Sequence, residues 1–331
     1  MALHAGRLLK PQILLPILLA TALLAFAASL GDIGRVAAGV TRLSVSTLVA
    51  ALIAAAAYLL VKAFQLNLLL KRLGFRVDRG PFWLAFTVGE LSVTLPLGLF
   101  AQNWILAAAH QADAVRSSAA TVMMVIGEIL VTFLFLACVG IPAWPQLRLA
   151  AIAVLAVMAV GLLTVPLLAQ HLERFATHLR HRWIRRSVGG GLTLLGSMRE
   201  LTNPFVLCAI IGLTALYLGA LSFAFWVTGR DVAVTHLGYI DATLIYAFSL
   251  AIILVGAGLL SQIGTTEVLG MVAAHSLGIG FSDSLALMLG FRIVWTACIW
   301  ALCLPVIGLT WRSIPRRAAS SRVDDREKVT H

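Results

Sequence analysis

A glutamate and an arginine interrupt apolar sequence near the C-terminal end of the chain. Glu267 lies in residues 255–281, VGAGLLSQIGTTEVLGMVAAHSLGIGF, and Arg292 falls in the first half of the apolar run that follows. A charged side chain in hydrocarbon costs several kcal/mol, so such residues face a protein interior or water and are functional candidates by default. Arg292 could bind an anionic group, with Glu267 holding it when that group is absent. The structural alternative is a fixed ion pair that only sets helix packing.

The first half of the chain carries a second set of charges at membrane depth. Lys62, Glu90 and Glu128 each fall within apolar sequence. Lys62 and Glu128 could form a compensated buried pair, or the lysine could extend its amine to the membrane surface. We predict that all three contribute to a ligand-binding site.

Polar residues beside Glu267 extend this candidate site. Their amide, hydroxyl and backbone groups could bind a polar head group, or they could only satisfy the irregular backbone of a broken helix. The binding residues predicted here are Gln262, Gly264 and Thr265.

The composition of the chain excludes several classes of function. With 331 residues, of which 60% are hydrophobic and 12% charged, the chain is too apolar for a soluble globule and is predicted to be a polytopic membrane protein. The net charge of +11 does not indicate nucleic-acid binding, because no soluble basic domain is present to carry it. No catalytic triad, HExxH motif or phosphate-binding glycine loop occurs, and the four cysteines lack metal-ligand spacing. We therefore predict no enzyme activity, no metal and no cofactor.

Six stretches are long and apolar enough to cross a membrane as helices. A crossing needs about 20 apolar residues at a rise of about 1.5 Å per residue. The predicted spans are residues 13–30, 45–70, 119–138, 149–168, 204–227 and 284–309.

Two further apolar stretches are broken in the middle. Residues 81–112 contain Pro96 and Gly98, and residues 239–280 contain a glycine-rich segment at 256–264. Proline and glycine interrupt helices, and irregular backbone at membrane depth is tolerated only inside protein or beside water. We predict two re-entrant hairpins whose tips meet near the midplane. The alternative is that every half crosses fully, which gives ten spans.

The positive charges favour one orientation. With both termini in the cytoplasm, the outer segments hold few of the 25 lysines and arginines, namely Arg35, Arg42, Arg148 and Arg230. The ten-span alternative gives the same orientation of the termini. The arginine-rich residues 171–200 contain Trp183, which is typical of an interfacial helix on anionic lipid and equally of a solvated loop.

The predicted fold is all-α, with six spans and two hairpins that enter from opposite faces. Opposed broken segments in the two halves of a chain are typical of an inverted repeat with a transport site near the midplane. We predict one integral membrane domain, comprising a first half (1–170), a basic cytoplasmic linker (171–202), a second half (203–311) and a basic tail (312–331).

Several short motifs carry a family resemblance. They are the basic, leucine-rich end of the second span (residues 62–74, KAFQLNLLLKRLG), the LPLG break at 95–98, Glu128, the IGTTE motif at 263–267, and Arg292. In these features the chain resembles the lysylphosphatidylglycerol synthase transmembrane-region family, which includes flippase-like proteins.

The resemblance implies a bacterial cytoplasmic-membrane protein that moves an anionic phospholipid or a polyprenyl-phosphate-linked lipid between leaflets. Its expected partners are membrane lipids, with an envelope lipid-modifying enzyme or a second copy of the chain as further candidates, and no nucleic acid. Two other functions stay open at this point. One is a non-catalytic scaffold subunit of an envelope lipid or glycolipid enzyme, and the other is a membrane-embedded lipid-modifying enzyme.

Overall fold

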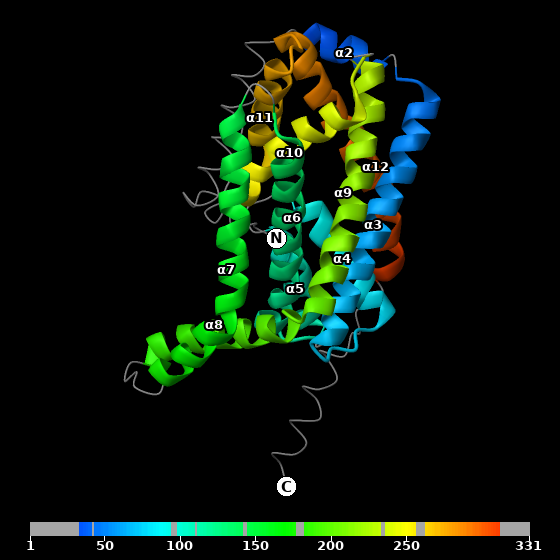
Figure 1. Cartoon of the computed structure of the whole chain (residues 1–331). Helices are drawn as coiled ribbons and strands as arrows, with labels where there is room; N and C mark the ends of the chain where they lie inside the picture. The colour runs from blue at the N-terminus through cyan, green and yellow to red at the C-terminus, as the bar shows by residue number, and fades with distance from the viewer. Residues whose placement is uncertain are drawn as a thin grey trace.

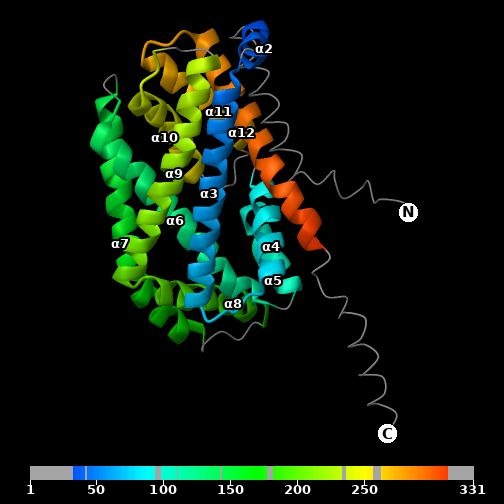
Figure 2. The ribbon, with the colours of Figure 1, turned by 90° about the vertical axis from the view of Figure 1, so that its right-hand side faces the viewer.

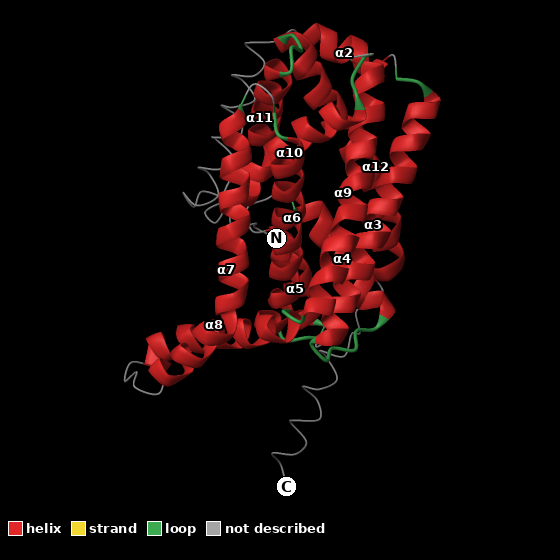
Figure 3. Cartoon of the chain, in the orientation of Figure 1, coloured by secondary structure: helices red, strands yellow, loops and turns green. Residues whose placement is uncertain are grey.

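The protein is a bundle of α-helices in every part of the chain that the structure describes (Figures 1 and 3). The computed structural model describes residues 33–41, 43–93, 98–109, 111–141, 144–176, 182–232, 236–255 and 262–311, and these ranges contain no strand. This confirms the predicted all-α class. The elements are α2 (Ile33–Thr41), α3 (Val45–Arg72), α4 (Arg79–Ser92), the 3₁₀ helix η2 (Gly98–Phe100), α5 (Ala101–Ala108), α6 (Ala114–Val139), α7 (Pro145–Ala176), α8 (Arg182–Leu201), α9 (Pro204–Val232), α10 (Tyr239–Val255), α11 (Gln262–Ser276) and α12 (Phe281–Thr310).

Five of the described helices are long and apolar enough to cross a membrane, namely α3, α6, α7, α9 and α12. Each contains one of the predicted spans in full, and the remaining predicted span, at 13–30, lies outside the described residues. Polar side chains cap the N-terminal ends of two of these helices, α3 and α6. The Ser44 hydroxyl accepts a hydrogen bond from the Thr47 N–H at 3.2 Å, and Asp113 accepts one from the Arg116 N–H at 2.8 Å.

The two broken stretches each form a pair of short helices. Helix α4 packs against α5, and α10 packs against α11. These helices have 14, 8, 17 and 15 residues, fewer than the roughly 20 that a crossing requires. The hairpin prediction therefore agrees with the structure better than ten full spans do. Residues 94–97 and 256–261 of the two breaks are not described, so the predicted meeting of the hairpin tips near the midplane lies outside the described residues.

The two hairpins occupy opposite ends of the bundle (Figures 1 and 2). Helices α4 and α5 lie at the end where α8 crosses the bundle, whereas α10 and α11 lie at the end capped by α2. Helix α7 lies on the outside against α6 and α8, and much of its apolar surface is exposed. Outside their own hairpins, α4 packs against α12, α10 packs against α6 and α9, and α11 packs against α12.

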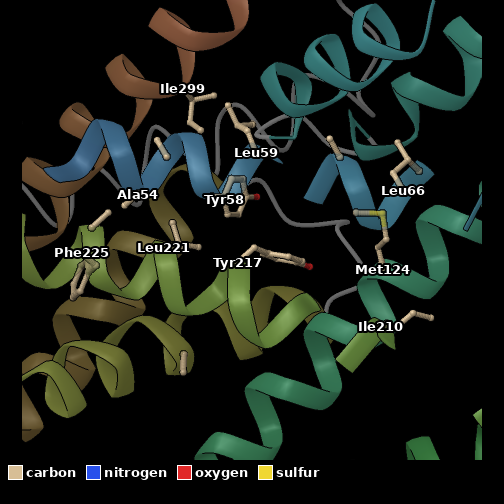
Figure 4. Packing of buried hydrophobic residues seen from close by; sticks show 14 of the residues in the cluster. Ala54, Tyr58, Leu59, Leu66, Met124, Ile210, Tyr217, Leu221, Phe225 and Ile299 are labelled. Carbon is tan, nitrogen blue, oxygen red and sulfur yellow. The ribbon is translucent and has the colours of Figure 1, made fainter. Parts of the chain in front are cut away.

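The core is centred on the contact between α3 and α9 (Figure 4). Small residues on α3, Ala51, Ala54 and Ala55, are buried and allow the two backbones to approach, as is common between membrane helices. Further along the same contact, the rings of Tyr58 and Tyr217 pack edge to face, with centroids 5.4 Å apart. Their hydroxyl groups reach the charged residues described below.

Gly98 allows the first hairpin to fold back on itself. A Cβ atom at this position would collide with the carbonyl oxygen of Ser92 at the end of α4. We expect Gly98→Ala to destabilise the protein by about 1–3 kcal/mol, because the hairpin backbone must shift to relieve the overlap. The free energy of unfolding in mixed micelles measures this effect. Gly212→Ala on α9 is the matched control, since beyond its chain neighbours and its own helix backbone no atom lies within 4 Å of its Cβ position. Equal stability of the two variants would contradict the prediction.

Candidate functional site

Lys62 lies on α3 between two glutamates from different helices. Its Nζ atom is 3.1 Å from Oε1 of Glu90 on α4 and 3.6 Å from Oε1 of Glu128 on α6. Lys62 and Glu90 are buried, with exposed fractions of 8% and 9%. The predicted pair of Lys62 with Glu128 is therefore incomplete, because Glu90 is the nearer carboxylate and the lysine is shared by both.

Two tyrosines complete this charged group. The Tyr58 hydroxyl accepts a hydrogen bond from Lys62 Nζ at 2.8 Å and donates one to Glu90 Oε2 at 3.3 Å. The Tyr217 hydroxyl, on α9, donates to Glu128 Oε1 at 2.8 Å. Lys62 Nζ also lies 5.0 Å and 5.6 Å from the centroids of the Tyr58 and Tyr217 rings, within range of cation–π attraction.

Sequence reasoning missed both tyrosines. The four-residue spacing of Tyr58 and Lys62 places them on the same face of one helix and could have identified the first. Nothing in the sequence links Tyr217 to Glu128, since 89 positions separate them.

Glu267 and Arg292 form a second ion pair. Arg292 Nε, on α12, donates to Glu267 Oε1 at 2.7 Å, and Arg292 Nη2 donates to Thr266 Oγ1 at 3.1 Å. Glu267 is only 2% exposed. The predicted contact between these two side chains is thus present in the structure, whereas their role in ligand binding stays a prediction.

Gly264 shapes the start of α11 around Glu267. Its φ angle of +85° is in the left-handed region, which glycine adopts without a steric penalty. This conformation directs its backbone N–H to Glu267 Oε2 at 2.7 Å. Both oxygens of the carboxylate are consequently held, one by the backbone and one by Arg292.

The other polar residues predicted near the Glu267–Arg292 pair do not all face the cavity described next. Thr265 is buried and is not among the residues that line the cavity described next, whereas Thr266 lines it and contacts Arg292. Thr266 is therefore the threonine that faces the cavity, and ligand binding by Thr265 stays a prediction. The side chain of Gln262 lies outside the described residues.

A single cavity of about 320 Å³ joins the two ion pairs. It is lined by residues from both halves of the chain, including residues near the end of α4 and the start of α11. Apolar and aromatic side chains from α9, α10 and α12 form the rest of the wall. The charged lining residues are Lys62, Glu90, Glu128, Glu267 and Arg292.

The cavity reaches the surface of the bundle along α12. Arg292, Thr296 and Trp300 are spaced by four residues, so they lie on one face of the helix, and all three line the cavity. Arg292 is partly buried, Thr296 is exposed and Trp300 is 52% exposed. Helix α12 runs from the α2 end towards the α4 and α5 end (Figure 2), so the opening lies on the side of the first hairpin.

Gln102 and Asn103 at the start of α5 have a structural role. Both side-chain amides donate to Thr121 Oγ1 on α6, at 2.9 Å and 2.8 Å, and neither residue lines the cavity. They connect the returning arm of the first hairpin to the bundle. Within the described residues, no group of three His, Cys, Asp or Glu side chains is placed to hold a metal ion.

Comparison with known proteins agrees with the resemblance. The family profile of the lysylphosphatidylglycerol synthase TM region matches residues 13–312, which is most of the chain and includes both hairpins and both ion pairs. No curated protein matches the sequence. This integral membrane protein therefore belongs to the lysylphosphatidylglycerol synthase transmembrane-region family.

Proposed function

We propose that this protein translocates an anionic phospholipid or a polyprenyl-phosphate-linked lipid between the leaflets of a membrane. The observation that carries the proposal is the cavity, in which an apolar helical bundle surrounds two ion pairs and each of the opposed hairpins supplies the carboxylate of one pair. The family name refers to a phospholipid synthase, which supports a lipid as the ligand.

The cavity matches the two chemical parts of such a lipid. Arg292 and Lys62 can each exchange a carboxylate partner for a phosphate oxygen, because both are charge-assisted hydrogen-bond donors that already contact glutamates in the cavity. The cavity that reaches Trp300 is also lined by apolar side chains, including Leu91, Val93 and Ile299. A head group would enter the cavity there while its acyl chains stay in the bilayer.

The hairpins supply elements that could open the cavity to alternate faces. Glu90 lies near the end of α4 and Glu267 near the start of α11, so each hairpin contributes the carboxylate partner of one cavity cation. Release of a carboxylate by an incoming phosphate would loosen the hairpin that carries it. In the predicted topology the opening beside Trp300 faces the cytoplasmic side, and the head group would enter from that leaflet.

Leaflet exchange in proteoliposomes tests the proposal. Vesicles of phosphatidylethanolamine and phosphatidylglycerol would carry trace fluorescent phosphatidylglycerol, and a membrane-impermeant quencher would report its transfer to the outer leaflet. We expect the wild-type protein to accelerate this transfer over protein-free vesicles. If the folded protein does not accelerate exchange of this lipid or of a labelled polyprenyl phosphate, the transport function is wrong and a scaffold role is favoured.

Glu267→Gln tests the second ion pair in the same assay. The two carboxylate oxygens of Glu267 accept one hydrogen bond each, from the Gly264 N–H and from Arg292. Glutamine has only one acceptor oxygen, and its NH₂ group would face the other donor, so the ion pair with Arg292 is lost. We expect exchange to slow by about tenfold, which corresponds to about 1.4 kcal/mol. Glu200→Gln, in the exposed pair with Arg116, is the matched control. Normal exchange by a folded Glu267→Gln variant would contradict the site assignment.

A further inference from the structure

The charges that line the cavity do not balance. Among the described lining residues there are two cationic side chains, Lys62 and Arg292, and three carboxylates, Glu90, Glu128 and Glu267. The tyrosine hydroxyl groups that contact them are neutral donors. With all five groups ionised, the cavity would hold one carboxylate in excess.

The geometry identifies Glu128 as the excess carboxylate. Glu267 contacts Arg292 at 2.7 Å, and Glu90 is the nearer partner of Lys62, at 3.1 Å. Glu128 is 3.6 Å from Lys62, and its second oxygen, Oε2, makes no hydrogen bond to any described residue. Its side chain is 15% exposed, more than that of Lys62 or Glu90. The open oxygen thus belongs to the residue that is least completely paired.

The elements around the cavity supply no further compensating charge among their described lining residues. Helix α3 contributes Tyr58 and Lys62, α4 contributes Glu90, α9 contributes Tyr217, and α10 contributes Tyr246 to the cavity wall. Across the cavity, α11 and α12 contribute the Glu267–Arg292 pair, which is internally balanced. The described parts of α5, α7 and α8 place no charged residue in the cavity lining. No further cationic side chain in the described lining therefore balances Glu128.

An anionic ligand increases this imbalance. A carboxylate in a low-dielectric interior is costly unless it is paired or binds a proton. A phosphate that enters with one negative charge would raise the excess from one to two. The phosphate would compete with these carboxylates for Lys62 and Arg292, and no further cationic residue of the described lining balances its charge.

We propose that one proton enters the cavity with each anionic lipid head group and binds to Glu128. The proton comes from water at the face to which the cavity is open, forms the O–H bond of the Glu128 carboxyl, and returns to water at the opposite face. No bond of the lipid is made or broken. For a lipid with one negative charge the combined movement is electroneutral. This inference rests on the proposed lipid transport and names its energy coupling.

A proton suits this position better than a metal cation. Lys62 Nζ lies 3.6 Å from Glu128 and would repel a second cation placed on the same carboxylate. An alkali or alkaline-earth ion also needs several oxygen ligands, whereas a proton needs one. Once protonated, Glu128 leaves Lys62 to Glu90 and to the arriving phosphate.

Transmembrane pH gradients test the coupling in the proteoliposomes described above. Fluorescent phosphatidylglycerol is the probe, and the membrane potential is held at zero with potassium and valinomycin. With coupling of one proton to one lipid, a gradient of one pH unit is expected to shift the steady-state ratio of label between leaflets by up to about tenfold, towards the alkaline side. A sodium gradient at equal pH is expected to cause no shift.

The outcomes separate this inference from the transport function. Exchange that is accelerated without a gradient but does not respond to the pH gradient would overturn the coupling and leave the transport function intact. A response to sodium instead of pH would also overturn it, and no exchange at all would overturn both. These arms use only the wild-type protein, so they do not depend on any variant being folded.

Glu128→Gln assigns the proton site. We expect the pH-driven ratio of the label to fall from about tenfold to near one, because a glutamine binds no proton in this range. The steady-state ratio does not depend on the exchange rate, so a slower variant still reports the coupling. Glu128→Asp is expected to retain a pH response, and Glu200→Gln is the control on the exposed Arg116 pair. An unchanged pH response in Glu128→Gln would exclude Glu128 as the site.

Discussion

Replacing Arg292 by glutamine is expected to slow the leaflet exchange of anionic lipid by at least about tenfold. Hydrogen bonds from a charged donor contribute about 1.5–3 kcal/mol, and the guanidinium is the side chain best suited to a phosphate. Arg292 provides two of its donors to Glu267 and Thr266 on the cavity wall. Glutamine is uncharged and leaves Glu267, which is 2% exposed, without its cation.

Arg292→Lys separates the charge from the shape of the guanidinium. A single ammonium cannot reproduce the planar arrangement that contacts Glu267 and Thr266 together, so we expect exchange between that of the wild type and that of Arg292→Gln. Arg116→Gln is the control, because Arg116 pairs with Glu200 on the exposed surface. Each variant would be compared at equal reconstituted amounts after size-exclusion chromatography. Wild-type rates for folded Arg292→Gln would show that the arginine only fixes helix packing.

Replacing Lys62 by methionine is expected to destabilise the protein by about 3–5 kcal/mol, because it removes the shared cation from two buried carboxylates. Glu90 and Glu128 would then face each other with only the hydroxyl groups of Tyr58 and Tyr217 as donors. Methionine has a similar length, so the effect reports the charge more than lost packing. The free energy of unfolding in mixed micelles measures it.

A triple variant provides the test of this explanation. Lys62→Met combined with Glu90→Gln and Glu128→Gln removes all three charges, and we expect it to recover most of the lost stability, since neutral replacement of buried ion groups is often tolerated. Lys71→Met, at the exposed end of α3, is the control for a lysine outside the cavity. If the triple variant is no more stable than Lys62→Met, the loss arises from packing around the lysine stem.

The broken segments show how far local sequence determines the fold. Pro96, Gly98 and the glycines near Gly264 weaken helices wherever they occur, so the positions of both hairpins could be predicted without tertiary information. The partners in the cavity could not be predicted as completely. Helices such as α12 are apolar on every face, and the apolar pattern therefore does not set their rotation about the axis.

The undetermined rotation of the helices affected the prediction of the ion pairs. The contact of Glu267 with Arg292 was predictable because they lie on consecutive helices, α11 and α12, joined by one short turn. The pair of Lys62 with Glu128 was only one alternative, and Glu90 is in fact the nearer carboxylate. The rotation of α3 and α4 decides that preference. The same rotation brings the Tyr58 hydroxyl to Glu90, and the packing of α9 brings the Tyr217 hydroxyl to Glu128.

The sequence alone determined that this chain is an all-α membrane protein with broken segments in both halves and with charges at membrane depth. These properties follow from composition and local backbone preference, which act within a few residues of each position. Only the tertiary structure decided that both ion pairs line one cavity, that Glu90 and Glu128 share Lys62, and that the cavity opens beside Trp300. Those features depend on how distant helices pack and rotate against each other, because an ion pair needs its atoms within about 4 Å.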